Sequence, residues 1–169
     1  MALRNILTMT DPVLRKKSRK VTEFNDRIKQ LMDDLSDTLM KVDALGLASP
    51  QVGVLRRAVV VLIDEKEILE LINPEIIESE GETEIDEACL SCPGVLGRVV
   101  RPQRIIVRAD DRNGVEFTRE LEEVNARVVC HEIDHLDGIL LVDVAKEIFA
   151  DNEEYWNNRK KSEEEDKET

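Results

Sequence analysis

The chain contains only two histidines, and they stand four residues apart in the segment His131-Glu132-Ile133-Asp134-His135. Residues i and i+4 share one face of an α-helix, so both imidazoles can reach one metal ion if this segment is helical. Glu132 then lies about 100° around the helix from His131, near enough to reach a water at the metal without being a ligand. The spacing therefore predicts a metal-binding helix, which we place from about Val124 to Leu136, with Gly138 as its C-terminal stop.

Two histidines need at least one further ligand, and the segment Cys89-Leu90-Ser91-Cys92 offers two ways to supply it. Cys89 alone would leave the fourth position to water, as in a catalytic site. Cys89 and Cys92 together would close a structural Cys2His2 zinc site without activity. The 38 residues between Cys92 and His131 far exceed the ~12–15 of a zinc finger, which weakens the closed alternative.

Two other uses of these residues stay open at this point. A carboxylate such as Glu153 or Glu154 would complete the ligand set of a zinc protease, but it would leave the cysteines idle. Redox use of the Cys-x-x-Cys segment is the weakest alternative, because Pro93 and Gly94 follow it rather than the start of a helix. The cysteines number three, so a secreted disulfide scaffold is not expected.

Helical patterns precede the metal-binding segment. Apolar residues recur at three- to four-residue steps from Ile28 to Met40, which predicts a helix that begins at Asn25 or Asp26 and ends near Val42-Asp43. A shorter helix is predicted to begin at Asp11-Pro12. Residues 44–53 are small and apolar with Gly and Pro, and predict a loop that passes close to another group.

Between the helices, runs of apolar and β-branched residues predict strands. The predicted strands are 58–63, 68–72, 76–84, 99–100, 105–107 and 115–121. Asn73-Pro74 and Arg112-Asn113-Gly114 mark turns between them, the second within a hairpin over 111–115. The order of helix, several strands and helix favours a single α+β domain.

Charge limits the partners of the chain. It carries 24 basic and 37 acidic residues, a formal charge of −13, which argues against non-specific nucleic-acid binding and against docking on an anionic membrane. No apolar run approaches the ~20 residues of a membrane span, and no secretory apolar region follows Met1. We therefore expect a cytoplasmic protein with no membrane and no specific DNA partner.

Three segments together resemble the motifs of the peptide deformylase family, in the family's order and at its usual separations. They are Gly46-Leu47-Ala48-Ser49-Pro50-Gln51, Glu87-Ala88-Cys89-Leu90-Ser91 and His131-Glu132-Ile133-Asp134-His135-Leu136-Asp137-Gly138. The resemblance extends from Asp11-Pro12-Val13-Leu14 to about residue 145. It implies hydrolysis of the N-formyl group from the N-terminal methionine of newly made polypeptides, with release of formate.

The resemblance also implies the metal and the catalytic groups. One divalent metal ion would be held by Cys89, His131 and His135, with Fe²⁺ as the native ion and Zn²⁺, Ni²⁺ or Co²⁺ able to take its place. Glu132 would act as general base and acid. The side-chain amide of Gln51 and the backbone N–H of Leu90 would donate to the formyl oxygen.

On the substrate side, the resemblance implies that Gly46 offers its carbonyl to the substrate backbone. Leu45, Ile85 and Val128 would line a pocket for the methionine side chain, although ordinary core positions explain these three residues equally well. Ala88 would lie where the substrate backbone passes, and Glu87 would pair with Arg101. This chain departs from the family at a few small residues, and we expect these changes to tune activity rather than abolish it. The departures are Ala44, Ser49, Ala88, Cys92 and Cys130.

The resemblance further implies N-formylmethionyl nascent polypeptides as partners, met at the ribosome near the exit of its tunnel. The basic residues Arg15-Lys16-Lys17 and Arg19-Lys20 offer chemistry for rRNA contact, although a solvated basic face explains them more simply. We expect mainly antiparallel strands packed around a central helix carrying the two histidines, with an N-terminal pair of helices. Residues 1–150 would form the catalytic domain, and residues 151–169 a charged C-terminal helix or tail.

Overall fold

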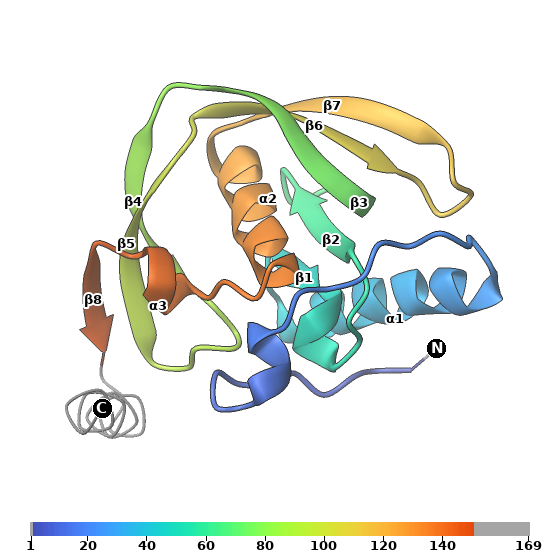
Figure 1. The fold of residues 1–169 in the computed structure, drawn as a ribbon. Helices are drawn as coiled ribbons and strands as arrows, with labels where there is room; N and C mark the ends of the chain where they lie inside the picture. Colours follow the sequence, from blue (N-terminus) through green and yellow to red (C-terminus); the bar gives the residue numbers. More distant parts are fainter. Residues whose placement is uncertain (1, 151–169) are drawn as a thin grey trace, which may run out of the picture.

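Strand β2 (Ala58–Ile63) is buried on both faces, which explains its continuous apolar sequence. Val59 and Val61 point to one side and join the core cluster that includes residues of helix α2 (Glu123–Leu136). Val60 points to the other side and joins the cluster formed with helix α1 (Asp26–Val42). The two helices therefore cover opposite faces of the same strand (Figure 1).

The computed structural model describes residues 2–150, whose strands form two antiparallel sheets within one domain (Figure 1). The larger sheet has the order β1-β2-β3-β6-β7, with β1 Gly46–Ala48, β3 Glu67–Glu80, β6 Arg104–Asp110 and β7 Glu116–Glu122. The smaller has the order β4-β5-β8, with β4 Thr83–Ala88, β5 Val95–Arg101 and β8 Glu147–Ala150. No helix among residues 2–150 is long and apolar enough to cross a membrane.

The two long helices agree with the sequence patterns. Asn25 caps α1, since its side chain accepts a hydrogen bond from the backbone N–H of Ile28 (3.2 Å), and Asp43 ends the helix in the left-handed conformation. Helix α2 lies between the two sheets and contains the whole segment from His131 to His135 (Figure 1). A short helix, α3 (Leu141–Val144), follows it.

The N-terminal region differs from the predicted pair of helices. One turn of 3-10 helix, Pro12–Arg15, forms after Asp11, and the chain is extended again from Lys16. The predicted loop over 44–53 is also partly regular: β1 pairs with β2, and a 3-10 helix covers Ser49–Val52. The predicted C-terminal helix or tail, residues 151–169, lies outside the described residues.

The predicted turn at Asn73-Pro74 is wrong, because β3 continues through it. Asn73 adopts a φ of 52°, and the pairing with β6 shifts register between Ile72 and Glu75, as in a β-bulge. The Asn73 side chain is anchored to the chain at Val21, donating to its carbonyl and accepting from its N–H at 2.8 Å each. The predicted hairpin over 111–115 is confirmed, since Asp111 N–H donates to the Val115 carbonyl at 2.9 Å.

Candidate metal centre

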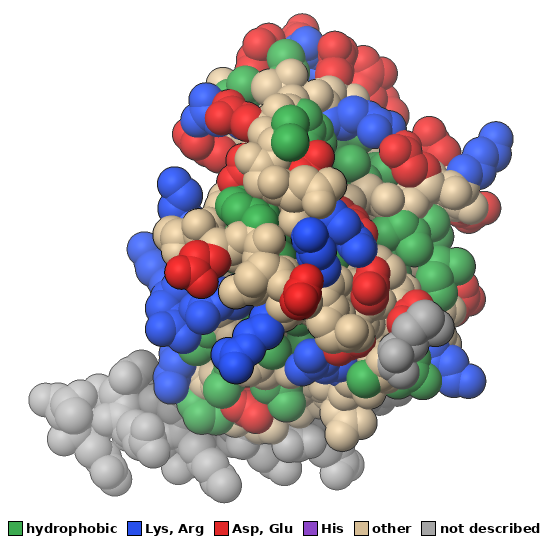
Figure 2. All heavy atoms as spheres, turned by 90° about the vertical axis from the view of Figure 1, so that its right-hand side faces the viewer, with side chains coloured by type: hydrophobic (Ala, Val, Ile, Leu, Met, Phe, Trp, Pro, Cys, Tyr) green, Lys and Arg blue, Asp and Glu red, His purple; other side chains and the backbone are tan. Residues whose placement is uncertain are grey.

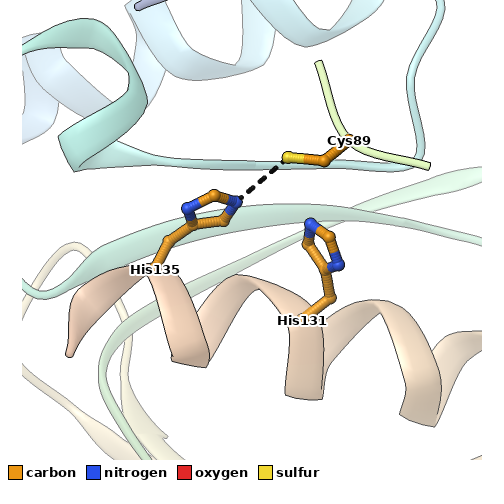
Figure 3. Close-up of side chains that lie close together, drawn as sticks. All are labelled: Cys89, His131 and His135. Atoms are coloured by element: carbon orange, nitrogen blue, oxygen red, sulfur yellow. Dashed lines mark hydrogen bonds between the residues drawn. The ribbon is translucent and has the colours of Figure 1, made fainter. Parts of the chain in front are cut away.

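One cysteine and two histidines come together where β4 ends beside α2. Cys89 directly follows the last residue of β4, and α2 presents His131 and His135 one turn apart. The ligand atoms of the three side chains lie within 4.8 Å of one another, and Cys89 Sγ is 3.3 Å from His135 Nε2 (Figure 3). Two elements distant in sequence thus bring three potential metal ligands to one point.

The chemistry of this cluster fits a divalent transition metal, since a thiolate and two imidazoles are ligands that such ions prefer. His131 Nδ1 is 3.0 Å from Glu87 Oε1, which leaves the other ring nitrogen for a metal. The buried thiol of Cys92 hydrogen-bonds that of Cys89, but Cys92 does not belong to the group of ligand atoms that lie within 4.8 Å of one another. Three protein ligands are typical of catalytic sites rather than closed structural ones. Glu153 and Glu154 lie outside the described residues.

Glu87 is the centre of a buried charge network behind His131. Arg101 donates two hydrogen bonds to its carboxylate, at 3.0 and 3.1 Å, and Arg127 donates one at 2.5 Å. Burial alone would raise the pKa of Glu87, but hydrogen bonds from His131 and Arg101 and the charge of Arg101 outweigh it and hold the pKa at about 2. The Glu87 carboxylate therefore stays ionised and orients the His131 ring.

Glu132 lies on α2 directly after His131 and is almost fully buried, with 4% of its surface exposed. Its Oε2 atom has no hydrogen-bond partner among residues 2–150. Burial raises the pKa of this carboxyl to about 7. A group with such a pKa can both accept and release a proton near neutral pH, as general acid–base catalysis requires.

Gln51 is held firmly beside Cys89. Its Oε1 accepts from the Ala48 N–H at 2.9 Å, while its Nε2 donates to Ser91 Oγ at 3.1 Å and lies 3.8 Å from Cys89 Sγ. Leu90 follows Cys89 and offers a backbone N–H that no residue of the described chain accepts. The Gln51 amide and the Leu90 N–H thus place two N–H donors next to the cluster.

A cavity of about 620 Å³ opens onto the cluster. Its lining includes all five predicted substrate-binding residues, which are Leu45, Gly46, Ile85, Ala88 and Val128. The Leu45 and Ile85 side chains are 42% and 48% exposed, so these two are not core residues. Val128 is half-buried and packs against the core. The cavity therefore combines exposed apolar side chains with Gln51, Cys89 and Glu132 in its wall.

Three residues at the site received no role from the sequence. Ser91 anchors Gln51, Arg127 binds Glu87, and Asp134 accepts a hydrogen bond from Arg101 at 2.6 Å. Arg127 stands four residues before His131, so the helical spacing placed it on the same face of α2. That spacing was the signal that could have identified it.

The remaining cysteine, Cys130, precedes His131 but takes no part in the cluster. It is buried in the core between α2 and the larger sheet. Burial raises the pKa of its thiol to about 11, which makes it unreactive.

Comparison with known proteins agrees with the geometry of the site. A family model described as polypeptide deformylase matches residues 3–150. A peptide deformylase of Caldicellulosiruptor bescii is 54% identical over 153 residues, which cover 90% of this chain and 92% of that protein. The crystal structure of a peptide deformylase from Legionella pneumophila is 41% identical with a TM-score of 0.82, covering 86% of this chain and 87% of that one. The crystal structure of a peptide deformylase from Thermotoga maritima is 35% identical with a TM-score of 0.83, and the match covers 87% of this chain and 100% of that one. The chain therefore belongs to the polypeptide deformylase family.

Proposed function

We propose that Cys89, His131 and His135 hold the single divalent metal ion with which this enzyme removes the N-formyl group from the N-terminal methionine of newly made polypeptides. The observation that carries the proposal is the convergence of one sulfur and two imidazole nitrogens within 4.8 Å. We propose Fe²⁺ as the native ion, with Zn²⁺, Ni²⁺ or Co²⁺ able to replace it. The mixed thiolate and imidazole ligand set is compatible with all four ions.

The residues around the cluster supply the remaining chemistry. A metal held there would polarise the formyl carbonyl and increase the acidity of the attacking water. The Glu132 carboxylate accepts a proton from that water and later returns it to the departing amine nitrogen, so that the amide and water become formate and a free amine. Gln51 Nε2 and the Leu90 N–H donate to the oxygen on which negative charge develops, and one such donor is typically worth ~3–4 kcal/mol of barrier.

The arrangement of the strands supports an extended substrate. β1 and β4 are both edge strands, and both border the cavity through Gly46, Ile85 and Ala88. An edge strand has free backbone groups that can pair with a peptide in extended conformation, so affinity would come mainly from backbone hydrogen bonds. Leu45, Ile85 and Val128 would receive the methionine side chain, while the Gly46 carbonyl would accept from the substrate backbone.

We also propose contact with the ribosome near its exit tunnel through the basic residues at 15–20. Lys16 and Lys17 are exposed and have no carboxylate partner among the described residues. Arg15 is instead paired with Asp143, so fewer unpaired basic side chains are present in residues 15–20.

Metal content and formate release together test the proposed site. Cys89→Ser should lose metal and activity on a formyl-methionyl dipeptide after anaerobic purification, whereas the matched control Cys92→Ser should keep both. Equal loss of metal in both variants would support a closed Cys2His2 site instead. Cleavage of internal peptide bonds that persists in Cys89→Ser would support a metalloprotease.

A further inference from the structure

A second cavity, of about 750 Å³, lies at the N-terminal end of α1. Its walls come from the segment over 19–25, the first turns of α1 and the turn at Val54 and Arg56. It shares no lining residue with the cavity at the metal centre. Its volume is within the range of ~300–1,000 Å³ that is typical of small-molecule sites.

The lining of this cavity is basic although the chain as a whole is acidic. Its basic residues are Arg4, Arg19, Lys20, Arg27 and Arg56, and its single acidic residue is Glu23. The formal charge of the whole chain is −13. Figure 2 shows the face that carries the N-terminal end of α1: Lys and Arg side chains gather at its lower left with a few Asp and Glu near them, and Asp and Glu are concentrated at its top. The cavity therefore lies on a locally positive surface.

Three of the arginines that line the cavity differ from the other arginines in having no ion pair with a described carboxylate. Among the 13 arginines of residues 2–150, ten pair with a carboxylate within 4.0 Å. The three that pair with none of the described carboxylates are Arg19, Arg27 and Arg56, and all three line this cavity. Arg19 and Arg27 are exposed and Arg56 is half-buried, so their charges are available to an anion that enters the cavity.

The backbone holds two of these cations next to each other. Arg19 and Arg56 form an isolated parallel bridge, in which Arg19 N–H donates to the Leu55 carbonyl at 3.1 Å and Arg57 N–H donates to the Arg19 carbonyl at 2.9 Å. The two side chains therefore start from fixed neighbouring positions. Binding an anion between them would cost little backbone entropy.

Apolar and neutral polar side chains contribute the rest of the wall. Val21, Ile28 and Leu31 are buried, and Val54 is half-buried beside them. Thr22, Asn25 and Gln30 add neutral polar groups. The cavity thus combines several guanidinium groups with smaller areas of apolar and neutral polar surface.

We propose that this cavity binds a small ligand of the nucleotide class that carries two or more phosphate groups. Guanidinium groups bind phosphate oxygens through paired hydrogen bonds, and the several unpaired cations match several phosphates better than one. The base would contact the apolar and neutral polar side chains between the cations. The limited volume of the cavity, about 750 Å³, favours a small molecule over a nucleic-acid strand.

Calorimetric titration of the metal-loaded enzyme tests this proposal. The probes are ATP, inorganic triphosphate, AMP, inorganic phosphate and a single-stranded RNA oligomer, all in excess Mg²⁺ so that polyphosphate does not remove the active-site metal. The variants are R19Q/R56Q and, should that double variant fold poorly, R27Q. The matched control K16Q/K17Q removes the same charge from exposed lysines outside the cavity. Formate release from a formyl-methionyl dipeptide should be unchanged in all variants, which confirms folding.

We expect ATP and triphosphate to bind at least tenfold more tightly than AMP and phosphate. R19Q/R56Q should weaken ATP binding at least tenfold, and K16Q/K17Q should not change it. The proposal is overturned by absence of ATP binding at millimolar concentration, or by equal losses in R19Q/R56Q and K16Q/K17Q. It is also overturned if the RNA oligomer binds at the cavity more tightly than ATP does.

Discussion

A Cβ atom added to Gly46 would lie 2.8 Å from Oε1 of Glu132, so the absence of a side chain in β1 makes room for the carboxylate of α2. The same atom would lie 2.7 Å from Cγ1 of Val128. Both contacts are shorter than side-chain atoms tolerate, and neither neighbour is free to move, since Glu132 is buried and Val128 packs against the core. The position of the proposed general base therefore depends on a residue in another element.

Gly46→Ala should displace the Glu132 carboxylate while leaving the three proposed metal ligands in place. A displacement of about 1 Å at a catalytic group can cost on the order of 100-fold in rate, so we expect kcat/KM to fall by about that factor. Metal content should stay at that of the parent enzyme. The control Ala44→Gly removes a methyl group from the same segment and should retain nearly full activity. Full activity in Gly46→Ala would contradict the role of Gly46.

Gln51 and Ser91 should contribute unequally to catalysis. Gln51→Ala removes a proposed donor to the developing oxyanion and should lower kcat by about 10²–10³-fold. Ser91→Ala removes only one anchor of the amide, because the Ala48 N–H still holds Gln51 Oε1 at 2.9 Å, so its effect should be clearly smaller. Steady-state kinetics on a formyl-methionyl peptide measure both losses of kcat. A larger loss in Ser91→Ala than in Gln51→Ala would contradict the role assigned to Gln51.

Glu87→Gln should weaken both metal binding and folding. The His131 ring would lose the carboxylate that orients it, and such changes around a metal site typically cost 10–100-fold in metal affinity. Arg101 and Arg127 would lose their buried counter-charge, at about 3–5 kcal/mol of unfolding free energy. Competition with a chelator and urea denaturation measure the two effects. Asp86→Asn, which removes the neighbouring exposed carboxylate in β4, is the matched control and should change neither.

Asp34 should stabilise the N-terminal segment in a pH-dependent way. Burial would raise its pKa, but hydrogen bonds from Gln30 and Arg4, a further one from the Ala2 N–H and the charge of Arg4 together lower it below the usual 3.8. A carboxyl with a lowered folded-state pKa contributes stability above its unfolded-state pKa and loses it as the pH falls through the folded-state value. Asp34→Asn should therefore cost about 1–3 kcal/mol at pH 7, and the difference from the parent should shrink below about pH 4. Denaturation across this pH range checks the prediction, and a difference that is constant from pH 7 to pH 3 would disprove it.

Local sequence patterns are sufficient to predict an element when several features of the sequence indicate the same structure. The predicted helix over 124–136 agrees with α2 within one residue, because the histidine spacing indicates a helix and Gly138 marks its end. The predicted strand over 58–63 has the observed ends of β2, since a strand buried on both faces has an unbroken apolar sequence. In both cases the local preference and the packing agree.

The features that the sequence did not predict depend on contacts between residues distant in the chain. β1 has only three residues and exists because β2 offers it an edge, so no local pattern marks it. Asn73-Pro74 has the composition of a turn, but the Asn73 side chain bonds the backbone of Val21, 52 residues away, and the strand continues with a bulge. The role of Arg127 depends on Glu87 of β4, which lies 40 residues earlier.

Formate release by the anaerobically purified, metal-loaded enzyme and its Glu132→Gln variant is the most direct test of the proposed mechanism. The substitution keeps the size of the buried side chain and removes only its ability to take up a proton. We predict that the parent releases formate from a formyl-methionyl dipeptide, and that the variant binds the same amount of metal but is at least 10²-fold slower. Equal activity of the two proteins, or no activity in either, would contradict the assignment of Glu132 and of the site around it.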